Sequence, residues 1–281
     1  MTIVEPGLWL SFTTACGGIF GLLIGSFLNV VVYRVPNGLS IVSPPSACPS
    51  CGYTIKAYDN VPVLSWLVLR GKCRNCATPI SKRYPLVEAA TGIAFAGVVL
   101  WAWTGAAWAR PLDGAPGILV LIGFLYLAAV SVALGLIDID TLRLPDAIVL
   151  PGYLVGAALF AAASIITGDY SALLRAAVGM ASLWTAYLLM ALAYPGGMGL
   201  GDVKLAGLLG MFLGWTGWGP LAIGAFAAFL LGGLYSVILL AAGKAGRKSG
   251  IPFGPWMLAG AWIGILAGPM LWRGYLALVG L

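Results

Sequence analysis

Two acidic stretches stand at the ends of long apolar runs in this chain. Asp202 follows Gly199-Leu200-Gly201, and the run Ile137-Asp138-Ile139-Asp140 closes an earlier apolar segment. Carboxylates at a membrane boundary are energetically costly, so each of them needs a reason. When two carboxylates share a poorly solvated site, one keeps its proton while the other activates water, as in aspartic proteases. The pattern predicts cleavage of a peptide bond by Asp202 and an acid of the earlier stretch.

Spacing alone does not decide which acid is the partner of Asp202. Asp138 and Asp140 lie in the same short run, and Asp146 follows shortly after them. Asp140 has a simpler interpretation as a solvated loop residue. Asp146 has a simpler interpretation as a helix N-cap, because it follows Leu144-Pro145 and precedes an apolar run.

Glycines surround the approach to Asp202. A helix N-cap is the simpler interpretation of this aspartate, but a capping residue does not need several glycines before it. Glycine lets another backbone come close, which suits an extended peptide beside the carboxylate, and close helix packing is the alternative. Lys204 either favours ionisation of Asp202 or marks the inner membrane surface. The glycines are Gly196, Gly197, Gly199 and Gly201.

Four of the five cysteines form two C-x2-C pairs that are 21 residues apart, in a polar segment between two apolar runs. Two such pairs complete a four-sulfur zinc site with no open position for catalysis. The segment has few large apolar side chains and cannot build a core alone, so we expect a structural Zn²⁺. A disulfide and a redox pair are the alternatives. The expected ligands are Cys48, Cys51, Cys73 and Cys76.

The composition excludes most water-soluble folds. The chain is 61% hydrophobic and only 9% charged, and it contains no histidine that could serve as a base or ligand. In lipid every backbone polar group must be bonded internally, so continuous apolar runs must form helices, and an alternating barrel pattern is missing. The net charge of +6 reflects the Lys and Arg that membrane insertion favours in cytoplasmic loops, so we expect no nucleic-acid partner.

Eight apolar runs predict an all-α membrane protein of about eight spans. The N-terminus has no basic region or cleavage-site pattern, so we expect the first run to be a retained helix. The sixth run is short for a bilayer that needs about 20 residues. The runs cover residues 8–33, 86–108, 117–137, 147–167, 172–194, 203–214, 219–243 and 252–272.

The distribution of basic residues predicts the orientation. If the N-terminus lies outside, twelve basic residues face the cytoplasm and three face the opposite side, which is a strong positive-inside signal. Both acidic stretches then lie at cytoplasmic ends of spans and can meet without crossing the bilayer. The twelve are Arg34, Lys56, Arg70, Lys72, Arg74, Lys82, Arg83, Arg143, Lys204, Lys244, Arg247 and Lys248; the three are Arg110, Arg175 and Arg273.

Several motifs in this order resemble the bacterial prepilin peptidases, a family of G-x-G-D aspartic membrane proteases. The resemblance runs over nearly the whole chain. It rests on residues 25–34 (GSFLNVVVYR), the cysteine segment from Cys48 to Cys76, residues 84–88 (YPLVE), Asp138 with Leu144-Pro145-Asp146, Gly199-Leu200-Gly201-Asp202, and residues 252–255 (PFGP).

The resemblance implies specific roles. It makes Asp138 the first catalytic aspartate and Asp202 the second, because the first stands six residues before the Leu of Leu-Pro-Asp. It implies cleavage of leader peptides from type IV prepilins or pseudopilins at the inner membrane, in pilus assembly or type II secretion. Members with the four cysteines usually also methylate the new amine with S-adenosylmethionine, and Gly71 matches a position linked to that activity. The segment between Arg34 and Cys48 is shorter than in many members.

These expectations divide the chain into a first span (residues 1–33), a cytoplasmic zinc segment associated with methyl transfer (34–85) and a membrane protease region (86–281). A transporter with carboxylates near the middle of its spans is one rival class. A non-enzymatic assembly protein that uses the zinc segment for docking is another. No internal repeat is evident.

Overall fold

The computed structural model describes residues 6–104, 114–194, 197–243 and 251–280. Within these ranges the secondary structure consists of helices and two isolated β-bridges. The elements are α1 (Pro6–Arg34), a 3₁₀ turn (Ala57–Asp59), α2 (Leu64–Val68), α3 (Arg83–Thr104), α4 (Ala115–Thr141), α5 (Asp146–Thr167), α6 (Ser171–Ala193), α7 (Leu200–Thr216), α8 (Trp218–Ala241) and α9 (Gly254–Leu278). The predicted all-α class, with the cysteine segment between the first two long helices, is confirmed.

Seven of the described helices are long and apolar enough to cross a membrane, and α7 is the long helix that falls outside this group. With 17 residues it rises only about 26 Å, against roughly 30 Å for the hydrocarbon core. Nearly every side chain from Val203 to Thr216 is buried. The short run is therefore a central helix enclosed by its neighbours. Three of the basic residues used for the orientation, Lys244, Arg247 and Lys248, lie outside the described residues, as does Arg110.

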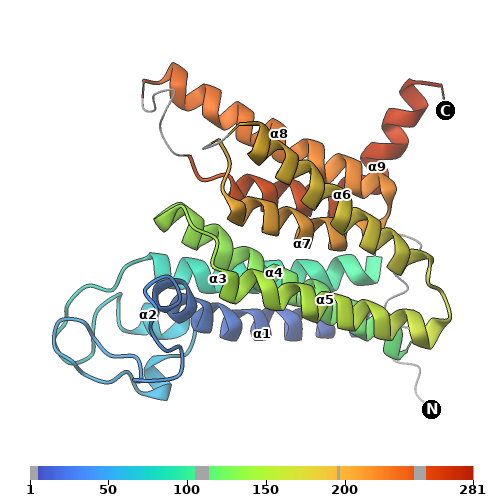
Figure 1. The fold of residues 1–281 in the computed structure, drawn as a ribbon. Helices are drawn as coiled ribbons and strands as arrows, with labels where there is room; N and C mark the ends of the chain where they lie inside the picture. Colours follow the sequence, from blue (N-terminus) through green and yellow to red (C-terminus); the bar gives the residue numbers. More distant parts are fainter. Residues whose placement is uncertain (1–5, 105–113, 195–196, 244–250, 281) are drawn as a thin grey trace, which may run out of the picture. The chain divides into compact units, whose positions relative to one another are not determined.

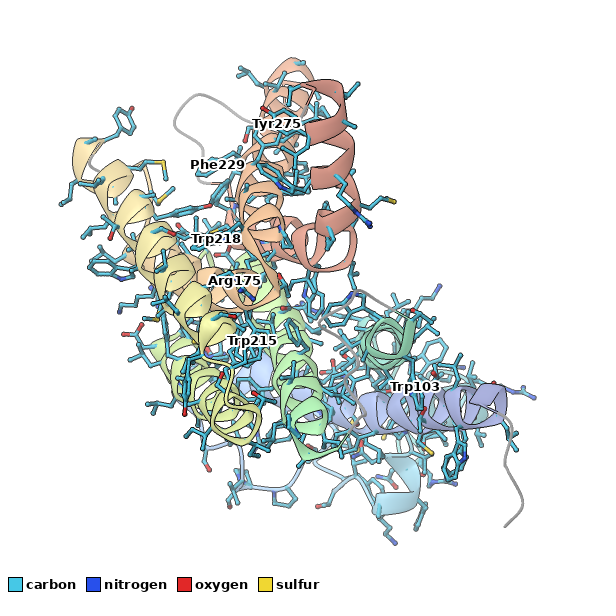
Figure 2. The ribbon with its side chains drawn as sticks, turned by 90° about the vertical axis from the view of Figure 1, so that its right-hand side faces the viewer. Trp103, Arg175, Trp215, Trp218, Phe229 and Tyr275 are labelled. Atoms are coloured by element: carbon cyan, nitrogen blue, oxygen red, sulfur yellow. The ribbon has the colours of Figure 1, made fainter. Side chains whose placement is uncertain are left out.

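Contacts divide the chain into two compact units, Met1–Thr104 with Leu127–Ala133, and Gly105–Tyr126 with Leu134–Leu281. In the first unit α1 packs against α3, and the cysteine segment lies at one end of this pair (Figure 1). A Cβ built at Gly25 would come within 2.7 Å of Glu88 Cα, so glycine permits the close approach. At the other end, Trp103 donates a 2.8 Å hydrogen bond to Thr13 Oγ1 (Figure 2).

In the second unit α7 lies against α6, α8, α9 and α5. Gly179 of α6 faces Gly210 of α7 so closely that a Cβ at either position would meet the opposing backbone carbonyl. Aromatic rings fill the space farther along α7, where Trp215 stacks on Phe160 at 4.3 Å (Figure 2). This packing holds α7 in place and thereby positions the carboxylate in its first turn.

Candidate active site

Asp138 lies near the end of α4 with only 4% of its surface exposed. The backbone N–H of Gly254, the first residue of α9, donates a 2.9 Å hydrogen bond to its Oδ2. A Cβ built at Gly254 would lie 2.8 Å from the same oxygen. Glycine is thus needed here so that the start of α9 can approach the carboxylate.

Asp202 occupies the third position of α7, and its Oδ2 accepts a 3.1 Å hydrogen bond from the backbone N–H of Gly199. The simpler interpretation of Asp202 as the N-cap is therefore wrong, because Gly199 is the capping residue. The carboxylate folds back over the start of the helix, where the exposed N–H groups and the helix dipole favour an anion.

The two acids belong to one site. Asp138 is close enough for its charge to act on Asp202. Leu144 links their surroundings: its Cδ2 would lie 3.3 Å from a Cβ at Gly254, and its Cβ would lie 3.0 Å from a Cβ at Gly201. The end of α4, the start of α7 and the start of α9 therefore converge.

The glycines near Asp202 have different surroundings. Gly201 packs against Leu144, as the close-packing alternative expects, whereas a Cβ at Gly199 would meet only Asp202 Oδ2 at 3.4 Å and its own neighbouring backbone. Gly197 lies against the ring of Tyr194. Gly196 lies outside the described residues.

Asp146 is not a helix N-cap, because Pro145 holds that position. Its carboxylate instead accepts hydrogen bonds of 2.7 and 2.8 Å from Lys204 Nζ. Tyr153 adds a second tie between α5 and α7 by donating to the carbonyl oxygen of Lys204. Asp140 is exposed, and it lies on the surface rather than with Asp138.

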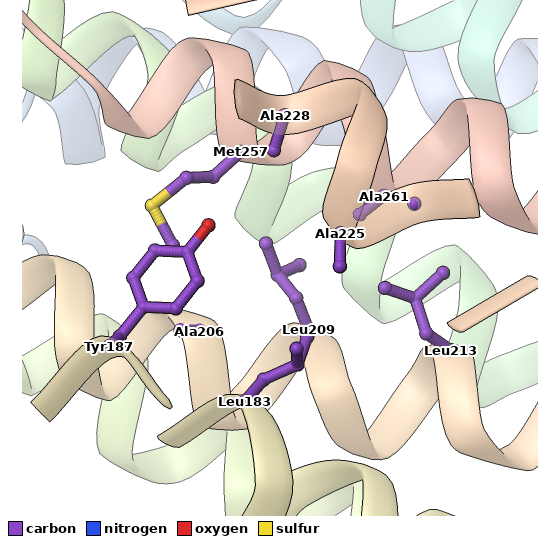
Figure 3. Close-up of a pocket in the computed structure, with 10 residues that line it drawn as sticks. Leu183, Tyr187, Ala206, Leu209, Leu213, Ala225, Ala228, Met257 and Ala261 are labelled. Atoms are coloured by element: carbon purple, nitrogen blue, oxygen red, sulfur yellow. The ribbon is translucent and has the colours of Figure 1, made fainter. Parts of the chain in front are cut away.

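A small cavity lies along the face of α7 that carries Asp202. Its lining includes Ala206, Leu209 and Leu213, which follow Asp202 at helical spacing, and Tyr187 from α6. Figure 3 shows the Tyr187 ring beside the Met257 side chain of α9. The cavity is therefore apolar and lies between α6, α7, α8 and α9, and neither aspartate belongs to its lining.

Tyr187 was not predicted from the sequence. It is 3% exposed and lies near Asp202. Its ring is 5.3 Å from Phe229, which is 5.5 Å from Phe253. Of this cluster, only Phe253 belonged to a motif. Tyr187 and Phe229 lie in apolar helices, where the sequence does not distinguish a residue of the site from a residue of the core.

The four predicted cysteine ligands come together. The Sγ atoms of Cys48, Cys51, Cys73 and Cys76 all lie within 4.8 Å of one another, and the thiols are free. Cys48 Sγ and Cys76 Sγ are 3.7 Å apart, which matches the roughly 3.8 Å edge of a tetrahedron with Zn–S bonds of about 2.3 Å. A hydrogen bond with the Thr78 hydroxyl lowers the pKa of Cys76 to about 6, which favours the thiolate that a metal needs. The donor set fits a tetrahedral metal ion.

The two cysteine pairs have the same backbone pattern, although no repeat was expected. In the first pair, Cys48 N–H donates to Tyr53 O and Gly52 N–H donates to Cys48 O. The second pair repeats these two bonds 25 residues later: Cys73 N–H donates to Thr78 O, and Ala77 N–H donates to Cys73 O. The bridges Ala47–Thr54 and Lys72–Pro79 follow the same offset. The matching C-x2-C letters were the sequence signal of this repeat.

Gly71 lies two residues before Cys73 and has a φ of +67°, which favours glycine. A Cβ at this position would lie 2.8 Å from Cζ2 of Trp66. The Trp66 indole in turn donates a 3.1 Å hydrogen bond to Ile80 O. Gly71 thereby shapes the loop around a tryptophan.

Comparisons with known proteins assign the chain to a family. The family model for the bacterial peptidase A24 N-terminal domain matches residues 19–103, which include the four cysteines. The model for the type IV leader peptidase family matches residues 125–237, which include Asp138 and Asp202. A prepilin leader peptidase/N-methyltransferase of Pseudomonas aeruginosa is 37% identical over 94% of both chains. This chain belongs to the type IV leader peptidase family.

Other members of the family are similar over more than nine tenths of their length. Proteins with the same name from Pseudomonas putida and Stutzerimonas stutzeri are 37% and 34% identical, covering 99% and 93% of this chain and 97% and 93% of their own. No solved structure matches this chain. The family and the seven apolar helices together make it a multi-pass protein of the inner membrane.

The cysteine cluster leads to a testable prediction about metal content. Purified wild-type protein should contain one Zn²⁺ per chain, and Cys48→Ser or Cys73→Ser should lose it, because three thiolates do not complete the tetrahedral site. Elemental analysis by mass spectrometry measures the metal. Cys16→Ser is the control, since Cys16 lies on α1 outside the cluster. Wild-type protein without bound zinc would contradict the assignment.

Proposed function

We propose that this chain is a membrane-embedded aspartic endopeptidase that removes the leader peptide of type IV prepilins or pseudopilins. Its catalytic residues are Asp138 and Asp202. The observation that carries the proposal is the convergence of these two carboxylates, each held by one backbone N–H, at the ends of otherwise apolar helices.

The chemistry is general acid–base hydrolysis. One carboxylate is ionised and takes a proton from water as the water oxygen attacks the scissile carbonyl; the other is protonated and donates a hydrogen bond to that carbonyl oxygen. The proton then passes to the leaving nitrogen as the C–N bond breaks. The shared proton belongs to the pair rather than to either residue. Gly254 N–H and Gly199 N–H each engage one oxygen of their carboxylate, which leaves the second oxygen of each for substrate and water.

Gly199, Gly201 and Lys204 support this site. At Gly199 a missing side chain leaves room beside Asp202, and at Gly201 it allows contact with Leu144. Lys204 pairs with Asp146 at the start of α5, which adds a half-exposed contact beside the first turn of α7. The substrate peptide lies along the glycines, and its apolar part continues into the membrane.

The cysteine segment supports a second activity. Zn²⁺ held by the four cysteines organises residues 34–85 in place of a core, and this segment serves methylation of the new N-terminal amine. S-adenosylmethionine is the methyl donor. Gly71 supports methyl transfer by letting the loop fold closely around Trp66.

Residues 86–281 carry the protease. The N-terminus lies outside, and the aspartates and the cysteine segment face the cytoplasm, in the setting of type IV pilus assembly or type II secretion.

Replacing either catalytic acid tests the protease directly. Asp138→Asn and Asp202→Asn should each reduce cleavage of a candidate prepilin by at least about 100-fold, because the pair can no longer exchange a proton. Mass spectrometry of the prepilin after incubation reports loss of the leader.

Asp140→Asn and Asp146→Asn are the matched controls, and both should retain substantial cleavage. The Asp146–Lys204 pair is half exposed, and such pairs contribute only about 0–1 kcal/mol. Full activity of Asp138→Asn or Asp202→Asn would refute the catalytic assignment. An inactive Asp140→Asn would show that Asp140 is the partner of Asp202.

Methyl transfer has its own test. Gly71→Ser should reduce addition of a methyl group far more than cleavage, since the new side chain collides with Trp66 in a loop distant in sequence from both aspartates. The same mass-spectrometric assay with S-adenosylmethionine measures both reactions. Gly38→Ser is the control, because Gly38 also has a positive φ, +67°, but no atom lies within 4 Å of the place that a Cβ would take there. Equal loss of both reactions, or equal effects of the two substitutions, would contradict a specific role of Gly71.

A further inference from the structure

The short helix α2 in the cysteine segment exposes an apolar surface. Leu64, Leu67 and Val68 are 60%, 57% and 76% exposed. Trp66, between them, turns into the segment and donates a hydrogen bond to Ile80 O. The three exposed side chains thus form an apolar face that the packing of the segment leaves uncovered.

A hydrogen bond fixes the start of α2 against the long helices of the same unit. The backbone N–H of Val63 donates to Glu88 Oε2 over 2.7 Å, and this carboxylate is 8% exposed. Val63 has a φ of +60°, a strained conformation for a β-branched residue. A second, longer contact joins Ser26 Oγ of α1 to Asn60 Oδ1. The segment before α2 is therefore held in one defined place.

These contacts set the level of α2 relative to the membrane. Glu88 lies five residues inside the start of α3 and Ser26 eight residues before the end of α1, which corresponds to about 8 and 12 Å along the helices. Leu86 of α3, close to this level, is 66% exposed. The start of α2 is therefore held at the first turns of α3, where Leu86 exposes an apolar side chain that lipid can accommodate.

The basic residues that follow α2 in the chain also suit a position at the membrane surface. The chain from Leu64 to Arg83 contains five basic residues and no acidic residue. Arg70, Lys72 and Lys82 are among them, on the two sides of the second cysteine pair. An apolar face flanked by Lys and Arg is typical of helices that lie in the headgroup region of anionic membranes.

We propose that α2 is an interfacial anchor, with Leu64, Leu67 and Val68 inserted among the lipids of the adjoining leaflet and with Arg70, Lys72 and Lys82 near anionic headgroups. Glu88 holds the anchor at the correct level by binding Val63 N–H. The cysteine segment is then attached to the bilayer as well as to α1 and α3, which keeps it close to the membrane surface.

Site-specific photocrosslinking tests the anchor in the intact protein. The full chain is reconstituted into bilayers that contain phosphatidylglycerol, with p-benzoylphenylalanine replacing Leu64, Leu67 or Val68 in separate variants. After irradiation, mass spectrometry of the protein detects covalent lipid adducts. We expect lipid adducts at all three positions.

Val42 is the matched control. It is an apolar residue that is 86% exposed, more than Val68. Its segment is held by Arg34, at the end of α1, which donates to Ser40 O and Pro44 O. The control is tied to the last residue of α1, whereas α2 is tied to Glu88 inside α3, so position 42 should give several-fold fewer lipid adducts than Val68.

Two outcomes would overturn the anchor. Lipid adducts no more frequent at positions 64, 67 and 68 than at position 42 would show that the face is not in lipid. Adducts to an added prepilin in place of lipid would assign the face to substrate docking instead. Because three independent positions are used, a single variant that fails to fold does not decide the result.

Discussion

The buried carboxylate of Asp138 is the constraint on which the arrangement of the site depends. A carboxylate that is 4% exposed needs a hydrogen-bonding partner, and Gly254 N–H at the start of α9 supplies it at 2.9 Å. That contact requires a glycine and brings α9 to the end of α4. Leu144 then fills the space between Gly254 and Gly201, next to Asp202. The hydrogen bond therefore joins the end of α4 to the start of α9, and the packing of Leu144 joins both to the start of α7.

Much of this organisation could be predicted from the sequence, because continuous apolar runs in lipid must be helices and because C-x2-C pairs have few uses. The burial of α7 could not, since its short run looked like an incomplete span rather than a central helix. Asp146 was expected to cap its helix, but it pairs with Lys204, 58 residues away in the chain. The place of Tyr187 near Asp202 could not be predicted, because the neighbouring sequence of a buried tyrosine in an apolar helix is the same whether or not a carboxylate lies nearby in the fold.

The cysteine segment has two kinds of support that act at different places. The four thiols gather at a repeated backbone pattern, and the segment between the two pairs is fixed by Glu88 through Val63 N–H. The first can take the place of a core, because Cys48 is the one hydrophobic residue of residues 34–85 that is buried. The second connects the segment to a membrane helix. Gly71 lies close to the second cysteine pair against Trp66, so the glycine that we propose to serve methyl transfer belongs to the architecture of this segment.

The central claim is that Asp138 and Asp202 act as one pair that shares a proton. The dependence of kcat/KM on pH for cleavage of a prepilin, measured in detergent or bilayers, tests it most directly. The pair must be singly protonated, so activity should fall on the acid side as the base is protonated and on the alkaline side as the acid ionises, giving a bell-shaped profile. A profile that rises through one ionisation and then stays level would show that one carboxylate acts alone, and would contradict the account.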